Sequence, residues 1–423
     1  MKKYLLLITF LLGGLYVSSQ DLDNIKKLIL LQQYEKAKPE IDTYLADAKN
    51  TGKAEAWYYK AYVYYSLGRV ETKPLAESQT LLQGAFDAIK KYTELDTKLA
   101  LTTEEKNGTV YNIYYSYYDL GVKAYNAKSF PESYELFKRS LEVHDYIYGK
   151  NLLAANNLKF SLHDTDVVWN LAVLANELKK KDDALVYYTK IADANLGDEK
   201  YAVAYDELIL KYKKEKNAAL FTKYLAAARK HYPVDKPYWD GQEIDFSVNG
   251  LENEALLTKY EELTQKLPDN YIVFYNYAIE IDKFLGSDAS KGKDIAAYRK
   301  KTEDLFKKAI TIKSTVEANL QLANMNYDKS FDLQEQIAKI KGSNASEVKL
   351  RNELIAQRKL TMAETIPYAE AAIKQLAALT EYKFADKANY KLAIEILINA
   401  YKLGGNTAKV AELEKQKLLV DKL

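Results

Sequence analysis

The stretch from Tyr114 to Asp145 constrains the fold more than any other part of this sequence. Its apolar and small residues recur at helical spacing, which predicts two short amphipathic helices joined by a tight turn near Lys128–Pro131. Ser129 is placed to cap the second helix, and Pro131 fits the first turn, where no internal N–H bond is lost. The two stripes are formed by Tyr117, Leu120, Gly121, Ala124 and Tyr125, and by Ser133, Phe137, Ser140 and Leu141.

Small residues stand in these stripes where large ones would be expected, and Gly121 is the clearest case. Glycine in a helix interior costs about 1 kcal/mol relative to alanine, so a close-packing reason is expected. We predict that Gly121 forms the groove into which the Phe137 ring fits, as a ridge of the second helix. A hairpin of this size cannot bury its apolar face alone and needs neighbours stacked against it.

The pattern resembles the tetratricopeptide repeat. The positions that carry the resemblance are Tyr117, Leu120, Gly121, Ala124, Tyr125, Phe130, Ser133, Phe137 and Ser140. Ser133 and Ser140 replace the two alanines of the family pattern, and Asp145 replaces its terminal proline. The resemblance implies a binding scaffold built from stacked helical hairpins.

The same spacing recurs from Asp21 almost to the C-terminus, with Pro233 and Pro268 at the ends of two second helices about one repeat length apart. We therefore expect an all-α, right-handed solenoid of about eight or nine tetratricopeptide-type helix pairs over residues 20–423. Residues 332–365 are expected to form a charged helical insertion, and residues 386–423 a capping hairpin. Further structural repeat positions are Ala184, Ala228 and Ala309.

The N-terminus is predicted to be an export signal. Lys2 and Lys3 precede an apolar run over residues 4–17, and small residues at Val17 and Ser19 suit cleavage after Ser19. An uncleaved membrane anchor is the alternative, although the run is shorter than the ~20 residues that a span needs. The absence of cysteine excludes disulfides and a lipid-anchored export signal. Gln20 after the cleavage site resembles exported Bacteroidota proteins, so we expect a periplasmic or outer-membrane-associated protein.

Charge argues against a nucleic-acid partner. The whole chain has 61 basic and 59 acidic residues, and the two signal lysines account for the difference. The mature chain would therefore be neutral, and no long run of one sign stands out.

No group of residues that would form a catalytic, metal or phosphate-binding site is evident. The three histidines, His144, His163 and His231, are not within helical reach of one another and are expected at surfaces or helix ends. The segment 286–294 superficially resembles a phosphate-binding loop, but it has a wrong glycine spacing and Asp294 where Ser or Thr is needed. We therefore expect a loop there, and a non-enzymatic protein without a metal or cofactor.

A surface of first helices is the remaining candidate site. The resemblance implies that certain first-helix positions face a bound peptide along a concave groove. These positions hold Tyr58, Tyr62, Tyr65, Tyr115, Tyr118, Tyr125, Trp169 and Asn176. Trp169 and Tyr118 are expected to be the most exposed. The alternative is that the rings pack between hairpins, since the chain has 37 tyrosines.

The expected function is an exported interaction scaffold that binds a protein or peptide through this groove. The carboxylate-gripping form of the family is not supported, because tyrosines occupy the positions where Lys, Arg and Asn would be needed. The alternative is a glycan-binding protein of the cell envelope, since tyrosine and tryptophan rings stack on sugars. Contact with a membrane is expected only indirectly or through an uncleaved signal.

Overall fold

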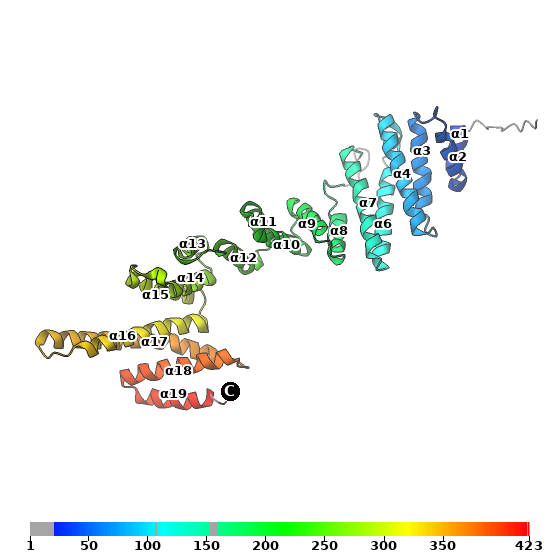
Figure 1. Ribbon diagram of the computed structural model, residues 1–423. Helices are drawn as coiled ribbons and strands as arrows, with labels where there is room; N and C mark the ends of the chain where they lie inside the picture. The colour runs from blue at the N-terminus through cyan, green and yellow to red at the C-terminus, as the bar shows by residue number, and fades with distance from the viewer. Residues whose placement is uncertain (1–20, 106–107, 153–159, 421, 423) are drawn as a thin grey trace, which may run out of the picture. The chain divides into compact units, whose positions relative to one another are not determined.

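A computed structural model describes residues 21–105, 108–152, 160–420 and 422. These residues form α-helices and short 3₁₀ turns, with no β-strand among them, so the all-α fold class is confirmed. Nine pairs of successive antiparallel helices can be followed along the described chain (Figure 1). The chain divides into two compact units, Met1–Tyr232 and Pro233–Leu423.

Unit 1 holds five helix pairs and one short extra helix. Its helices are α1 (Leu22–Leu30), α2 (Tyr34–Ala46), α3 (Ala54–Gly68), α4 (Leu75–Leu95), α5 (Ala100–Glu104), α6 (Gly108–Asn126), α7 (Phe130–Gly149), α8 (Thr165–Glu177), α9 (Lys181–Asp193), α10 (Ala202–Lys214) and α11 (Ala218–His231). Each first helix packs against its partner, and each second helix packs against the first helix of the next hairpin. The core is therefore a strip that runs along the row of hairpins, with no single centre.

Unit 2 holds four pairs. Its helices are α12 (Lys236–Val248), α13 (Asn253–Lys266), α14 (Tyr271–Leu285), α15 (Ile295–Ile312), α16 (Val316–Lys339), α17 (Ala345–Ala377), α18 (Phe384–Gly404) and α19 (Thr407–Val420). Residues 332–365 cover the C-terminal part of α16, the turn that follows it and the N-terminal part of α17. Asn344 caps α17 through Glu347 N, and Arg351 donates to the carbonyls of Ile340 and Gly342, which fixes that turn.

The α6–α7 hairpin shows the close approach that the sequence predicts. A Cβ added to Gly121 would lie 3.1 Å from Cε1 of Phe137, so the ring occupies the groove left by the missing side chain. Ser133 Oγ donates to the Gly121 carbonyl at 2.8 Å. Because the serine side chain is short, this hydrogen bond forms only where the α6 and α7 backbones lie close together. Ser129 holds the N-cap position of α7, but its hydroxyl contacts Glu132 rather than a backbone N–H.

The other repeat positions divide into buried small residues and exposed helix ends. Ala184, Ala228 and Ala309 are buried, and Leu120 is half-buried. The two prolines are exposed, and each follows the C-cap residue of a second helix. Pro233 begins a short 3₁₀ turn after α11, and Pro268 comes after α13.

Tyrosine hydroxyls on one first helix contact residues at the start of the first helix in the next hairpin. Tyr58 on α3 contacts Thr109 at the start of α6 at 3.2 Å, and Tyr114 on α6 donates to the α8 cap Asp164 at 2.7 Å. In unit 2, Tyr271 on α14 contacts the α16 cap Thr315 at 2.8 Å. A buried phenol needs a hydrogen-bond partner, so these pairings also fix the spacing between hairpins.

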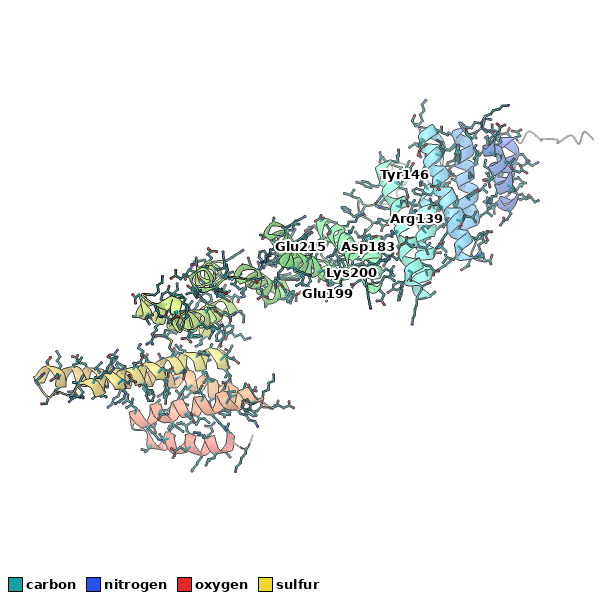
Figure 2. All side chains as sticks on the ribbon, viewed as in Figure 1. Arg139, Tyr146, Asp183, Glu199, Lys200 and Glu215 are labelled. Atoms are coloured by element: carbon teal, nitrogen blue, oxygen red, sulfur yellow. The ribbon has the colours of Figure 1, made fainter. Side chains whose placement is uncertain are left out.

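Second helices are joined in the same way. On α7, Tyr146 contacts Thr93 of α4 through its hydroxyl, and Tyr134 donates to Asp183 of α9 at 2.9 Å. Tyr146 on α7 and Asp183 on α9 are labelled in Figure 2. Helix α7 is therefore hydrogen-bonded to the hairpin before it and to the hairpin after it.

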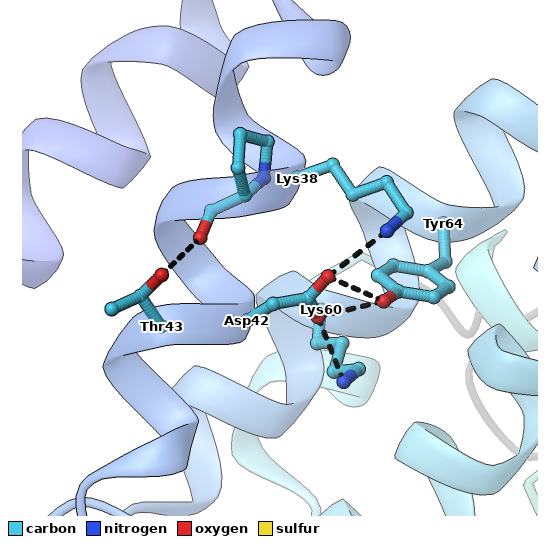
Figure 3. Close-up of polar contacts among 6 residues, drawn as sticks. Lys38, Asp42, Thr43, Lys60 and Tyr64 are labelled. Atoms are coloured by element: carbon cyan, nitrogen blue, oxygen red, sulfur yellow. Dashed lines mark hydrogen bonds and ion pairs between the residues drawn. The ribbon is translucent and has the colours of Figure 1, made fainter.

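A charged cluster joins α2 to α3 (Figure 3). Asp42 accepts from Tyr64 Oη at 2.6 Å, from Lys38 Nζ at 3.0 Å and from Lys60 Nζ at 2.9 Å. Burial raises the pKa of Asp42, but the hydrogen bonds from Tyr64 and the two lysines outweigh it, so the net pKa lies below the ordinary 3.8.

The predicted signal peptide, residues 1–19, and its cleavage after Ser19 lie outside the described residues. Among the helices that the structure describes, none is both long and apolar enough to cross a bilayer.

Replacing Gly121 with leucine tests the α6–α7 contact. The new side chain would overlap the Phe137 ring, so the variant should lose about 1–3 kcal/mol of unfolding free energy through overpacking. Urea unfolding followed by circular dichroism measures the loss. Gly241→Leu on α12 is the matched control, because a Cβ there would meet nothing within 4 Å. An unchanged midpoint for Gly121→Leu would refute the contact.

Replacing Asp42 with asparagine tests the α2–α3 cluster. The folded pKa of Asp42 is lowered, so its contribution is complete above pH 3.8 and is lost as the pH falls below that value. Asp42→Asn should therefore cost about 1–2 kcal/mol at pH 7 and much less at pH 3, by urea unfolding at each pH. The control is Asp87→Asn, whose exposed ion pair with Lys90 should contribute under about 0.5 kcal/mol. Equal losses at both pH values would contradict this account.

Candidate partner-binding surface

A row of tyrosine rings runs along one face of α6. Tyr111, Tyr115 and Tyr118 are spaced by four and three residues, so they fall on the same face of the helix. The Tyr111 and Tyr115 rings stack at 6.3 Å and 19°, and the Tyr115 and Tyr118 rings at 6.4 Å and 24°. Tyr115 is 53% exposed, so the middle ring of this tyrosine row is open to a partner.

A hollow of about 580 Å³ lies on one side of the row, between α6 and the α3–α4 connection. We call it the α3–α6 hollow. Tyr115, Asn112 and Ser116 line its α6 wall. Its other wall carries charged side chains of both signs, including Arg69 and Glu71. Lys123 also lines it and pairs with Asp119 at 3.1 Å.

A second hollow of about 290 Å³, the α6–α8 hollow, lies between α6, α7 and the start of α8. Tyr111 and Tyr114 belong to its wall together with Asp164 and Asp166. Tyr114 and Asp164 are hydrogen-bonded to each other, and the Asp166 side chain, 71% exposed, lies 3.9 Å from Lys200 Nζ. The tyrosine row therefore separates a hollow of mixed charge from one with an acidic rim.

Two of the expected site residues are buried and do not line an exposed surface. The Tyr58 ring lies 5.2 Å from the Tyr92 ring, and the Tyr65 ring lies 5.2 Å from the Tyr62 ring. Burial raises the pKa of Tyr58, and its phenol stays protonated against Thr109. These two tyrosines pack within the core, as the alternative based on tyrosine abundance expects.

Three expected residues are half-buried. Tyr62 contacts Tyr34 of α2 at 6.2 Å, and Tyr118 meets the edge of Phe137 at 5.5 Å. Trp169 on α8 meets Tyr201 edge-on at 5.4 Å. Each ring has one face committed to packing, so the expectation that Tyr118 and Trp169 are the most exposed was wrong.

The remaining expected residues are exposed. Tyr115 and Tyr125 both lie on the row face of α6, and Tyr125 also contacts Phe130 at 5.6 Å. Asn176 lies exposed in the last turn of α8. The structure thus brings Tyr115, Tyr118 and Tyr125 together on one helix face, and leaves Tyr62 in a contact with α2.

Sequence reasoning missed Tyr111 and the charged wall of the α3–α6 hollow. Tyr111 lies four residues before Tyr115, so helical spacing alone could have placed it in the row. Arg69 and Glu71 belong to a connection between helices, and no periodicity indicates where a connection folds.

His144 is a correction to the expectation of surface histidines. It is 2% exposed, stacks on Phe160 at 5.1 Å, and both ring nitrogens have partners, Asp145 Oδ1 and the Ser161 carbonyl, each at 3.1 Å. It is therefore held as a core residue. In the described parts of the chain, no group of three or more His, Asp or Glu side chains is arranged to hold a metal.

The segment 286–294 forms a short 3₁₀ turn, Asp288–Ser290, and a loop. Asp294 accepts from Ala297 N and caps α15, which explains an aspartate at that position without a phosphate. The prediction of a loop is confirmed.

No protein-family model and no curated protein match this chain. Solved structures that are similar include human IFIT1 with m7Gppp-AAAA (15% identity, 94% of this chain and 88% of that chain, TM-score 0.22). Two others are the P58(IPK) TPR domain (15%, 90% and 98%, 0.23) and APC/C Cut9–Hcn1 (14%, 94% and 86%, 0.17).

Alanine substitution should separate core tyrosines from surface tyrosines. Tyr58→Ala removes a fully packed ring and should cost about 3–5 kcal/mol of unfolding free energy. Tyr115→Ala, on the exposed part of the row, should change it by about 0.5 kcal/mol or less. Thermal and urea unfolding of both variants gives the comparison. A large loss for Tyr115→Ala would make the row structural.

Proposed function

We propose that this chain is an exported, non-enzymatic scaffold that binds a protein or peptide through the tyrosine row of α6 and the hollows beside it. The observation that carries the proposal is the exposed Tyr115 ring, held in a stack between Tyr111 and Tyr118. Tyrosine has few rotatable bonds, so a ring already held by its neighbours loses little freedom on binding.

The hollows favour a peptide over a neutral sugar. Charged side chains of both signs line the α3–α6 hollow, and an exposed carboxylate, Asp166, stands at the α6–α8 hollow. A peptide carries backbone groups and charges of both signs, so it can pair with such walls. One of its apolar side chains can pack on the Tyr115 ring. A glycan that stacks on the same ring is the competing occupant.

Export is proposed from Lys2 and Lys3, the apolar run after them and the small residues up to Ser19. The cell envelope is the corresponding location. Catalysis is not proposed, because the one deeply buried histidine is held by two hydrogen bonds and the carboxylates near the row have structural partners. Asp164 caps α8, Asp166 pairs with Lys200, and Asp119 pairs with Lys123. A neutral mature chain likewise supports a partner other than nucleic acid.

Affinity purification with a single surface substitution tests this proposal. Tagged wild-type protein and Tyr115→Ser would be cross-linked in cell envelopes, purified and identified by mass spectrometry. Tyr148→Ser is the control, because Tyr148 is a tyrosine of similar exposure on α7 that lies outside the row. A protein retained by the wild type and by Tyr148→Ser, and reduced at least tenfold with Tyr115→Ser, is the expected result.

Two results would overturn the proposal. Identical proteins with all three baits would remove the row from binding. Retention of a glycan on an array, lost with Tyr115→Ser while no protein depends on that residue, would replace the peptide by a sugar.

A further inference from the structure

A hollow of about 390 Å³ lies between the second helices α4 and α7, and we call it the α4–α7 hollow. On α4, Gln79 and Gln83 line one wall. On α7, Glu135 and Arg139 line the other wall, and Tyr117 of α6 lies between the two helices. The residues of each wall are four apart, so they project from one face of their helix. The volume is within the range of about 300–1,000 Å³ that small-molecule sites have.

Tyr117 brings an unpaired hydroxyl to the floor of the hollow. The residue is 2% exposed, yet its hydroxyl has no hydrogen-bond partner among the residues that the structure describes. Other buried tyrosines of the same unit, such as Tyr92 and Tyr205, donate to a protein oxygen. Because a buried phenol normally has such a partner, the Tyr117 hydroxyl is available to a molecule in the hollow.

Electrostatics show which way this hydroxyl points. The charges of Arg139, Glu142 and Asp87 all act on the Tyr117 phenol, so the hydroxyl end of the ring lies toward α4 and α7. Burial raises the pKa of Tyr117, so the hydroxyl stays protonated and can both donate and accept.

The α4 wall adds carboxamide groups. Gln79 is half-buried, and its carboxamide has no hydrogen bond within the described parts of the chain. Gln83 Nε2 donates to Asp87 Oδ1 at 3.0 Å, which leaves the Gln83 carbonyl oxygen as an acceptor. Asp87 itself pairs with Lys90 at 2.7 Å, so the α4 side has no uncompensated charge.

The charged residues of the α7 wall are exposed, and each pairs along its own helix. Arg139, labelled in Figure 2, pairs with Glu142 at 2.8 Å. Glu135 pairs with Lys138 at 3.5 Å. The charges at the rim therefore cancel, and the deeper groups of the hollow are an uncharged phenol and uncharged amides. This arrangement favours an uncharged ligand over an ionic one.

The hollow offers little apolar surface to a ligand. Tyr117 and Leu136 line it but are 2% and 1% exposed, so neither presents an open ring or aliphatic surface. A peptide would bring side chains that need such a surface. A sugar instead carries hydroxyl groups around its ring, and each hydroxyl both donates and accepts hydrogen bonds.

We propose that the α4–α7 hollow binds a neutral, hydroxyl-rich small molecule of the size of a mono- or disaccharide. The Tyr117 hydroxyl and the carboxamides of Gln79 and Gln83 hydrogen-bond to its hydroxyl groups. At the rim, Arg139 supplies donors and Glu135 supplies acceptors. A free sugar and the end of a glycan chain share this chemistry.

This inference goes beyond the proposed function and does not depend on it. Tyr117 lies two residues from Tyr115, about 200° around α6, so the hollow and the tyrosine row belong to different faces of the helix. Partner capture is tested with Tyr115→Ser and sugar binding with Tyr117→Phe, so either proposal can fail alone.

Saturation-transfer NMR tests the proposal on the purified chain, with glucose, galactose, mannose, N-acetylglucosamine, maltose and lactose as probes. At least one probe should receive saturation from the wild type. Tyr117→Phe removes only the hydroxyl and should weaken binding of that probe about five- to tenfold, the effect of one lost hydrogen bond between uncharged groups. Gln79→Met should weaken it to a similar degree.

Tyr188→Phe is the matched control, because Tyr188 is a buried tyrosine of α9 that lies outside the hollow. It should bind the probe like the wild type. Urea unfolding separates binding from folding: Tyr117→Phe should keep the wild-type midpoint, since its hydroxyl pairs with no described protein group.

A glycan array read with the same variants distinguishes the two sources of sugar. Binding of a free probe that depends on Tyr117 identifies a free sugar. An array glycan that depends on Tyr117, while no free probe binds, identifies the end of a glycan chain. Both results support the proposal.

Three results would overturn the proposal. The first is no binding of any probe or array glycan. The second is binding that both Tyr117→Phe and Gln79→Met retain in full, or that Tyr188→Phe loses equally. The third is binding of glucose 6-phosphate at least tenfold tighter than glucose, which would make the hollow an anion site.

Discussion

The stacking of helical hairpins depends on hydrogen bonds that tyrosine hydroxyls make from one hairpin to the next. A hairpin cannot cover its own apolar face, so contacts between neighbours carry most of its stability. Tyr114 and Tyr271 each reach a residue that caps the following first helix, Asp164 and Thr315. The ring fills the space between hairpins, and the hydroxyl fixes their distance. This dual use explains why a chain without cysteine contains so many tyrosines.

The same residue type also forms the candidate binding surface, and position on the helix decides which role it has. On α6, Tyr117 is buried in the core while Tyr115, two residues earlier, faces outward. The row around Tyr115 is rigid because Tyr118 on one side packs against Phe137, the ring that also fills the groove at Gly121. Close packing within the α6–α7 hairpin thus holds the tyrosine row in place on the outer face of α6.

Helical periodicity was sufficient to predict the class of fold, the pairing of helices and the contact between Gly121 and Phe137, because these depend on residues close in sequence. Exposure of individual side chains was not predictable to the same degree. Tyr58 is buried because Tyr92 and Thr109 cover it, and His144 because Phe160 stacks on it. Those contacts depend on how connections and neighbouring hairpins fold, which one helix's pattern does not contain. The charged walls of the hollows were missed for the same reason.

The central claim is that the tyrosine row is a contact surface rather than part of the core. Site-specific photo-cross-linking measures this most directly, with benzoylphenylalanine placed at position 115 or, as a reference, at the similarly exposed position 148 on α7. Irradiation of intact cells should give a discrete protein adduct from position 115 that position 148 does not give. No adduct from position 115, or the same adducts from both positions, would contradict the account.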